Sequence, residues 1–385
     1  GKKVGLLELE KELTPELSDF LLQTELATAK LPYVYRRLYR IRPTEEEVFF
    51  EARNKELNLL SNYYQNWKNN NFSATAIIGE KGSGASSLVN FFLKEIDQST
   101  VIRKKLTNNK FTEVHFFNFF NELLGKENLN SVESIAEELN SGNYSLIILE
   151  DLQHFYIKKI QGFTALNMLF ELISKTEKKV YWLVEFTVYA WKYLEKSVSI
   201  NKYFKYSILL QQMSEEQIVK IIMKRHRVSG YDFQIDSSNL STSEKRKIKK
   251  LEEEEKDAYL KEIYFKALNR FAENNISLAL LYWIRSTKKV ENNVITIGIL
   301  KNLNFNLINT LPDESVFTLH ALLLHDSLTV EDHAQIFNND LLQSRLSLMV
   351  LVDKGILVQD ENRYQINRLL YRQVVNVLSN KNILH

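Results

Sequence analysis

The feature that most constrains this chain is a glycine-rich segment, Gly79-Glu80-Lys81-Gly82-Ser83-Gly84-Ala85-Ser86-Ser87. An apolar run over residues 74–78 precedes it, and a stretch of helical character over residues 87–96 follows it. Glycines between a strand and a helix let the backbone turn successive N–H groups inward and set a helix N-terminus against an anion. Residues 74–96 are therefore predicted to form a strand, a phosphate-binding loop and a helix. A glycine-rich turn in an unrelated α/β domain is the alternative.

The segment matches the P-loop pattern G-x-x-x-x-G-K-[ST] at every fixed position but one. Ala85 stands where the lysine belongs, and that lysine normally contacts the β- and γ-phosphates. Backbone amides and the helix dipole still suit a diphosphate, so weak or passive nucleotide binding is expected. The predicted phosphate contacts are Gly79, Gly82, Gly84, Ser86 and Ser87. Lys81, inside the loop, is a second source of charge, although its position directs it differently.

A second element is an apolar strand that ends in two acids, Leu146-Ile147-Ile148-Leu149-Glu150-Asp151, about 65 residues after the glycines. It resembles a Walker B motif, in which one carboxylate holds Mg²⁺ and the next polarises water. The usual order is Asp then Glu, and here the order is reversed. We expect Ser86 and Glu150 to hold the metal and Asp151 to be the catalytic carboxylate, with a shorter reach. An acid pair without function is the alternative.

The chain from about residue 46 to 210 alternates strand-like and helical stretches. Apolar runs occur at residues 74–78, 145–149, 180–186 and 206–210. Strands separated by helices imply a parallel sheet with crossover connections. The fold class is therefore α/β, with a P-loop parallel sheet at its centre.

The chain as a whole is predicted to have four parts. Residues 1–45 are predicted to be a helical connector that covers the next domain, with an apolar stripe at Leu13, Leu17, Phe20 and Leu21 and arginines among tyrosines at 33–42. Residues 46–213 form the α/β core and 214–305 a helical lid, in which the charged run 243–257 reads as a solvated helix. Residues 306–385 have the pattern of a winged helix, with helices near 315–324, 330–337 and 340–354 and a hairpin over 356–366.

From about residue 50 to 300 the chain resembles the AAA+ and STAND-type ATPases, nearest to their initiator-like group with a C-terminal winged helix. Arg53 begins an R-x-x-E-L motif, which in that group lies near the nucleotide base. Thr187 follows the third apolar run, at the place of the sensor 1 polar residue. Ser277 stands where the sensor 2 arginine is expected, and residues 201–205 offer lysines but no arginine finger.

This resemblance implies ATP or ADP with Mg²⁺ as ligands, at a degenerate site. An arginine finger alone accelerates hydrolysis roughly 10³- to 10⁵-fold. The lack of the loop lysine, the sensor 2 arginine and the finger therefore argues against efficient hydrolysis. The leading hypothesis is a scaffold or nucleotide-sensing switch. One alternative is an active ATPase coupled to DNA, with Lys81 or a neighbouring subunit supplying the cations. The other is a structural module that has lost nucleotide binding.

Charge and composition bear on partners. Residues 301–385 carry seven Lys and Arg against nine Asp and Glu, and Arg345 is the only cation inside the candidate recognition helix 340–354. Because DNA binding depends on neutralised phosphates, a protein partner or self-association is expected and DNA is not. The chain has no cysteine and no apolar run near 18 residues, which fits a cytoplasmic protein. A membrane tether upstream of Gly1 is left open.

The missing lysine gives a first prediction. Ala85→Lys should strengthen ATP binding, because it adds a cation near the β- and γ-phosphates, yet leave hydrolysis slow, because no arginine replaces Ser277 or Lys205. ATP affinity and single-turnover hydrolysis of the wild type and the variant check this. Rapid hydrolysis by the wild type would contradict it, as would an unchanged affinity in the variant.

Overall fold

The computed structural model describes residue 22 and residues 25–39, 53–300 and 306–384. The predicted apolar stripe at Leu13, Leu17, Phe20 and Leu21 lies outside the described residues. So does the Arg40 to Arg42 end of the connector. Among the helices of the described parts, none is long and apolar enough to cross a membrane.

A five-stranded parallel sheet forms the core, in the order β2-β3-β4-β1-β5. Its strands are β1 (Thr75–Gly79), β2 (Val101–Lys105), β3 (Leu146–Glu150), β4 (Tyr181–Thr187) and β5 (Tyr206–Leu209). β1 and β3 are buried along their whole length, as expected for a parallel sheet covered on both faces. The sequence analysis missed β2, because three of the five residues of this edge strand are charged and it has no continuous apolar run.

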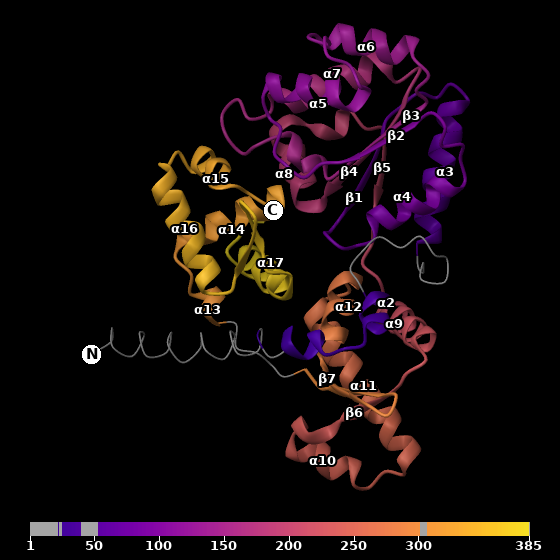
Figure 1. The fold of residues 1–385 in the computed structure, drawn as a ribbon, viewed down its shortest axis with the longest axis vertical. Coiled ribbons are helices and arrows are strands. Elements are labelled where there is room, and N and C mark those ends of the chain that lie inside the picture. The colour runs from indigo at the N-terminus through magenta and orange to yellow at the C-terminus, as the bar shows by residue number, and fades with distance from the viewer. Residues whose placement is uncertain (1–21, 23–24, 40–52, 301–305, 385) are drawn as a thin grey trace.

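Helices cover both faces of this sheet (Figure 1). On one face Ile77 packs with α3 (Asn54–Lys68) and α4 (Ala85–Lys94). On the other face Ile78 packs in a second core with the four remaining helices. These are α5 (Glu113–Leu124), α6 (Val132–Ser141), α7 (Thr164–Thr176) and α8 (Val188–Val198). Successive residues of β1 thus point to opposite faces, which fixes how the loop after it leaves the sheet.

The part of the chain predicted to be a helical lid contains helices and a small sheet. The helices are α9 (Glu215–Ser229), α10 (Thr242–Ile248), α11 (Glu253–Ala272) and α12 (Ile276–Arg285). The strands, in the order β6-β8-β7, are β6 (Asp232–Asp236), β8 (Val294–Gly298) and β7 (Thr287–Glu291). The all-helical prediction was therefore incomplete, and the charged run is divided between α10 and α11.

The described part of the N-terminal connector packs on this lid. In α2 (Tyr33–Leu38), the hydroxyl of Tyr35 accepts a hydrogen bond from Trp283 Nε1 at 2.8 Å. Tyr39 is buried beside the same tryptophan, and its hydroxyl donates to the carbonyl of Ile222 at 3.0 Å. The connector was expected to cover the α/β core that follows it, whereas its described part covers the lid.

The C-terminal unit has the predicted helices and hairpin. It consists of α13 (Asn306–Asn309), α14 (Asp313–His325), α15 (Val330–Phe337), α16 (Leu341–Asp353), β9 (Leu357–Asp360), β10 (Arg363–Ile366) and α17 (Tyr371–Asn380). It lies beside α8 and the sheet (Figure 1). Asn109 Nδ2 donates to Asp332 Oδ2 at 2.8 Å, and the amide of Lys158 donates to His325 Nε2 at 3.2 Å. The C-terminal unit is thus bonded to the loops that leave the sheet.

Candidate functional site

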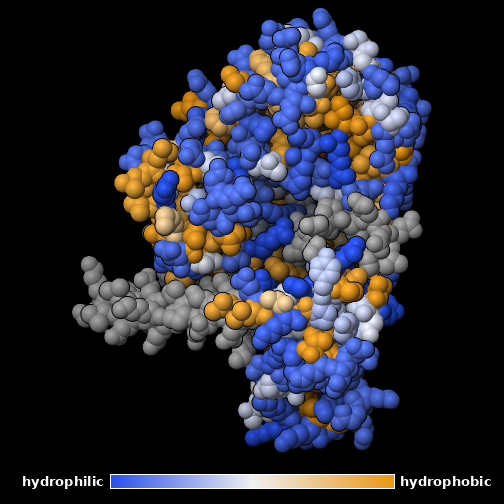
Figure 2. All heavy atoms as spheres, in the orientation of Figure 1, coloured by the Kyte–Doolittle hydropathy of each residue, from blue (hydrophilic) through white to orange (hydrophobic). Residues whose placement is uncertain are grey.

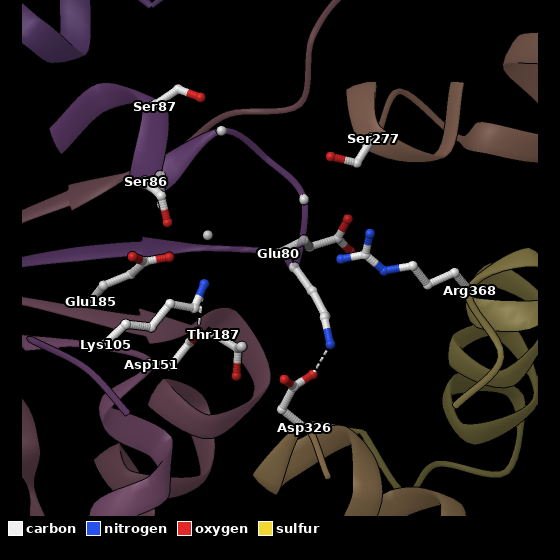
Figure 3. A pocket seen from close by; sticks show the side chains of 15 residues that line it. Glu80, Ser86, Ser87, Lys105, Asp151, Glu185, Thr187, Ser277, Asp326 and Arg368 are labelled. Atoms are coloured by element: carbon white, nitrogen blue, oxygen red, sulfur yellow. Dashed lines mark hydrogen bonds and ion pairs between the residues drawn. The ribbon is translucent and has the colours of Figure 1, made fainter. Parts of the chain in front are cut away.

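A cavity of about 310 Å³ opens at the carboxyl ends of the parallel strands (Figure 3). Ligand sites of open α/β sheets lie at this edge. The lining comes from the glycine-rich loop, the ends of β2, β3 and β4, the lid and the C-terminal unit. The lining residues are Gly79, Glu80, Lys81, Gly82, Gly84, Ala85, Ser86, Ser87, Lys105, Asp151, Glu185, Thr187, Ser277, Asp326 and Arg368.

The glycine-rich loop has the predicted form. β1 ends at Gly79, α4 begins at Ala85, and the loop between them faces the cavity. Gly82 and Gly84 have φ values of 81° and 98°, a left-handed region that glycine adopts without steric cost. The strand, loop and helix predicted for residues 74–96 are therefore confirmed, with all five predicted phosphate contacts lining the cavity.

Arg53, at the start of α3, is hydrogen-bonded to the backbone of this loop. Its guanidinium is buried, donating from Nη2 to the carbonyl of Ser83 and from Nη1 to Glu56 Oε1, both at 2.9 Å. Arg53 was predicted to lie near a nucleotide base, but it is not among the described residues that line the cavity. In this structure it positions the loop.

The lid holds the opposite side of the loop. Asn275 Nδ2 donates to the carbonyl of Lys81 at 2.9 Å, and the amide of Ser277 donates to the carbonyl of Gly82 at 3.4 Å. Ser277, at the place where the resemblance expected an arginine, lines the cavity with its short side chain. The contact is close, because a Cβ atom on Gly82 would lie 2.5 Å from Ser277 Cβ.

Three carboxylates gather where β3 and β4 end. Glu150 Oε1 accepts a hydrogen bond from Arg103 Nε at 2.6 Å, and Asp151 Oδ2 lies 3.1 Å from Lys105 Nζ. Gln153 Nε2 donates to the other oxygen of Asp151 at 3.0 Å. Glu185, the third, projects from β4 into the same cavity (Figure 3). Asp151, the predicted catalytic carboxylate, thus has a partner at each oxygen.

The protonation of these groups follows from burial and mutual repulsion. Burial, reinforced by Asp151 and Glu150, raises the pKa of Glu185 well above its ordinary value. Burial also raises the pKa of Asp151, although Lys105 opposes the shift. For Glu150 burial is outweighed by hydrogen bonds from Arg103 and Ser86, which leave its pKa below the ordinary value. Of the three, Glu150 is thus the carboxyl group whose surroundings lower its pKa.

No three His, Cys, Asp or Glu side chains of the described residues are grouped to hold a metal ion by themselves, so a divalent cation here would also need phosphate oxygens. Oε2 of Glu150 and Oε2 of Glu185 are buried oxygens without a hydrogen-bond partner, and Ser86 is close enough to lower the pKa of Glu150 by hydrogen bonding. Carboxylate and hydroxyl oxygens suit Mg²⁺, which commonly binds through one or two carboxylates plus substrate phosphates. Ser86 and Glu150 were predicted for this role, and Glu185 joins them as a candidate.

Thr187 ends β4 and lines the cavity, as predicted for a sensor 1 residue. Its hydroxyl accepts a hydrogen bond from the amide of Ala190 at 3.3 Å and so caps α8. Lys205, in the region where a finger arginine was sought, lies over the ring of Tyr206 at 5.4 Å. The polar end of β4 therefore positions a helix in this structure.

The C-terminal unit contacts the phosphate loop directly. Lys81 forms an ion pair with Asp326, which lies after α14. Glu80 accepts two hydrogen bonds from Arg372, with Nη1 to Oε1 at 2.8 Å, and a third from the Tyr189 hydroxyl at 2.8 Å. The sequence analysis did not identify these partners.

Arg368 also enters the cavity from the C-terminal unit, in the short 3₁₀ helix η5 (Arg368–Leu370). Neither Arg368 nor Asp326 belongs to a motif, because each is more than 240 residues from the loop. Glu185 carried a weak signal, as a single acid inside the apolar run 180–186. Lys105 carried none, because its strand was not recognised.

No model of a known protein family matches the chain. It is 30% identical over 167 residues to the tripartite terminase subunit 3 of human herpesvirus 6B, and equally to that of human herpesvirus 6A. The match covers 41% of this chain but only 21% and 20% of the viral proteins. The chain therefore spans about a fifth of the length of the curated relatives it matches.

Among solved structures, the Orc2 protein of Aeropyrum pernix in ADPNP and ADP complexes is 14% identical, covers 90% of this chain and 97% of its own, and has a TM-score of 0.42. Cdc6p of Pyrobaculum aerophilum is 14% identical over 88% of this chain and 98% of its own, with a TM-score of 0.39. The Orc1 protein of A. pernix, in complex with DNA, is 13% identical over 88% and 94%, with a TM-score of 0.40.

These likenesses are weak, and the fold assignment rests on the chain's own elements. Strand, phosphate loop and helix are followed by an acid-ended strand, a polar-ended strand, a lid and a C-terminal unit. This is the order expected from the resemblance to initiator-like AAA+ modules. The architecture is that of a P-loop α/β protein.

The close contact between loop and lid gives a prediction at Gly82. Gly82→Ala should lower the free energy of unfolding more than Gly84→Ala. In each variant alanine must adopt a left-handed backbone conformation, which costs roughly 1–2 kcal/mol. The space around Gly84 is open, whereas a Cβ atom on Gly82 would also meet Ser277. Urea denaturation of both variants measures the difference. Adding Ser277→Gly should recover the extra loss in Gly82→Ala; equal losses at the two glycines would contradict the contact.

Proposed function

We propose that this chain is a nucleotide-sensing switch or scaffold that binds ATP or ADP with Mg²⁺ and hydrolyses ATP weakly or not at all. The observation that supports it is the direct attachment of the C-terminal unit to the phosphate loop. Two consecutive loop residues, Glu80 and Lys81, pair with Arg372 and Asp326 of that unit. A ligand on the loop therefore acts on the C-terminal unit without an intermediary.

The ion pair of Lys81 with Asp326 makes phosphate binding and attachment compete. Asp326 lines the cavity, so a phosphate group bound on the loop meets a carboxylate of the same sign (Figure 3). A phosphate bound by Lys81 shares the ammonium group with Asp326 and so weakens their ion pair. The repulsion of phosphate by Asp326 and the competition for Lys81 both oppose this ion pair, so nucleotide binding weakens the attachment of the C-terminal unit. By linkage, attachment of the unit lowers nucleotide affinity by the same factor by which nucleotide weakens attachment.

Arg372 connects three parts of the molecule. Besides Glu80 in the loop, its guanidinium donates to the carbonyls of Ala272 and Glu273 in the lid, each at 3.3 Å. The side chain is buried, so a broken contact leaves a charge without its partner, which is costly. Movement of the C-terminal unit is thus coupled to the lid as well as to the loop.

Several features support weak hydrolysis. Ala85 and Ser277 replace two cations that stabilise charge in the transition state, and both oxygens of Asp151 already have partners. The hydroxyl of Thr187 caps a helix. These substitutions favour a sensing role over the alternative of an active ATPase coupled to DNA.

The absence of cysteine supports a cytoplasmic location.

The surface of the C-terminal unit supports a protein partner or self-association. α16, the candidate recognition helix of the predicted winged helix, exposes apolar side chains at helical spacing (Figure 2). These are Leu342, Leu346, Met349 and Val350, with 67, 56, 44 and 47% of their surfaces exposed. Apolar positions at i, i+4, i+7 and i+8 form a stripe suited to a second helix, and phosphates are not bound by such side chains.

Asp326→Asn tests the switch. Removing the carboxylate charge frees Lys81 and ends the repulsion of phosphate, so ADP and ATP affinity should rise about tenfold, within the usual range of coupling between sites. Fluorescence titration with a labelled nucleotide measures the affinity. Hydrogen exchange should show that a saturating nucleotide lowers amide protection in α14 and β10 of the wild type.

The matched control is Asp313→Asn. Asp313 belongs to the same C-terminal unit, is largely exposed and lies 3.7 Å from Lys381, away from the loop. Its substitution should leave affinity unchanged. Equal affinity in wild type and Asp326→Asn would refute the switch, and no binding to either protein would refute a nucleotide ligand altogether.

The apolar surface and acidic balance of the C-terminal unit predict negligible DNA binding. At about 150 mM salt, a short duplex should not bind the full chain at sub-micromolar concentration, because few cations are present to release counterions from the phosphates. Gel shift or anisotropy measures this. Sub-micromolar binding that weakens in Arg345→Ala would instead place DNA on α16.

A further inference from the structure

We propose that Lys105 supplies the phosphate-binding cation that the loop lacks at Ala85. This inference rests on the proposed nucleotide function and names a residue of the same site. The cation thus comes from the neighbouring part of the sheet instead of the loop. The ligand is the β- or γ-phosphate of a nucleoside di- or triphosphate.

The sheet places Lys105 at the right edge of the molecule. It is the last residue of β2, and β2 pairs in parallel with β3 so that Lys105 lies opposite Glu150. Carboxyl ends of parallel strands meet at one edge, which is where the phosphate loop also begins. Lys105 lines the same cavity as Gly84, Ala85 and Ser86, and its ammonium group points into the cavity (Figure 3).

The partners of Lys105 can change when a ligand binds. Its ammonium lies 3.1 Å from Asp151 Oδ2, and the side chain is 55% exposed, so it is not fixed by packing. Buried oxygens of Glu150 and Glu185 have no hydrogen-bond partner. The ammonium group has three N–H donors and the pair with Asp151 uses one of them, so the others are available for phosphate oxygens.

The other cations of the cavity are less suited to this role. Among the described residues, its lining contains three basic side chains, Lys81, Lys105 and Arg368. Lys81 is paired with Asp326 of the C-terminal unit, so its position also depends on that unit, whereas the partner of Lys105, Asp151, directly follows β3. Arg368 belongs to the C-terminal unit, so its position depends on whether that unit is attached. Lys105 is the basic residue at the end of a strand of the sheet, and β1 of the same sheet leads into the loop.

The neighbouring residue on the strand is a matched control. Side chains alternate along β2, so Lys104 points to the other face. It pairs with Glu122 at 2.8 Å and does not line the cavity. Lys104 and Lys105 therefore share residue type and strand but differ in their access to a phosphate.

The experiment compares nucleotide affinities by calorimetry in the presence of Mg²⁺. Lys105→Met should lower ADP and ATP affinity roughly 10- to 100-fold, the effect of losing a charged hydrogen bond, and leave adenosine affinity unchanged. Lys104→Met should change neither. Lys105→Arg keeps the charge and should retain most of the affinity. Ala85→Lys in the Lys105→Met background should restore ADP and ATP binding, because it returns a cation to the usual place.

Each result decides a different point. Wild-type binding that Lys105→Met leaves unchanged overturns this inference alone, whereas a wild type that binds no nucleotide overturns the proposed function with it. An equal loss of adenosine and ADP affinity also overturns the inference, because it shows a collapsed site. The inference is also overturned if the double variant Lys105→Met, Ala85→Lys is folded by thermal unfolding but does not recover ADP and ATP binding.

Discussion

The site depends on how the carbonyl groups of the phosphate loop are satisfied. The carbonyls of Lys81, Gly82 and Ser83 accept hydrogen bonds from Asn275, from the amide of Ser277 and from Arg53. Backbone acceptors away from water need such partners. Because these three donors lie outside the loop, the orientation of its carbonyls is fixed by the neighbouring elements. The start of α3 and the lid thus both shape the loop, and displacement of either changes its form.

Charge balance then determines how the cavity responds to a ligand. Glu150 and Asp151 have Arg103 and Lys105 as partners, Glu80 has Arg372, and Lys81 has Asp326. A phosphate with its metal disturbs all of these pairs, since it adds charges of both signs. The pairs within the sheet can exchange partners locally. The pairs to the C-terminal unit cannot do so without movement of that unit, and in the proposed switch this difference would make the C-terminal unit the responsive part.

The sequence predicted what is locally determined. β1, β3 and β4 are buried apolar runs, and the loop has glycines at positions with positive φ, so strand, loop and helix could be located from a few residues. β2, β6 and β7 were missed because these strands contain several polar or charged residues and no continuous apolar run, and β2 is stabilised by its pairing with β3. The contacts to Asp326 and Arg372 join residues 245 and 292 positions apart, which no local pattern encodes.

The edge strand β2 shows why an incomplete loop motif need not mean a site without a cation. A strand at the edge of a sheet tolerates charge that a central strand would bury. Its carboxyl end nevertheless lies beside β3, close to the phosphate loop, so a lysine there reaches the cavity without any change in the loop. Ala85 itself is only 6% exposed at the start of α4. The loop can therefore lose its lysine while the sheet retains a positive charge at the same site, which separates phosphate binding from the arginine-dependent step of hydrolysis.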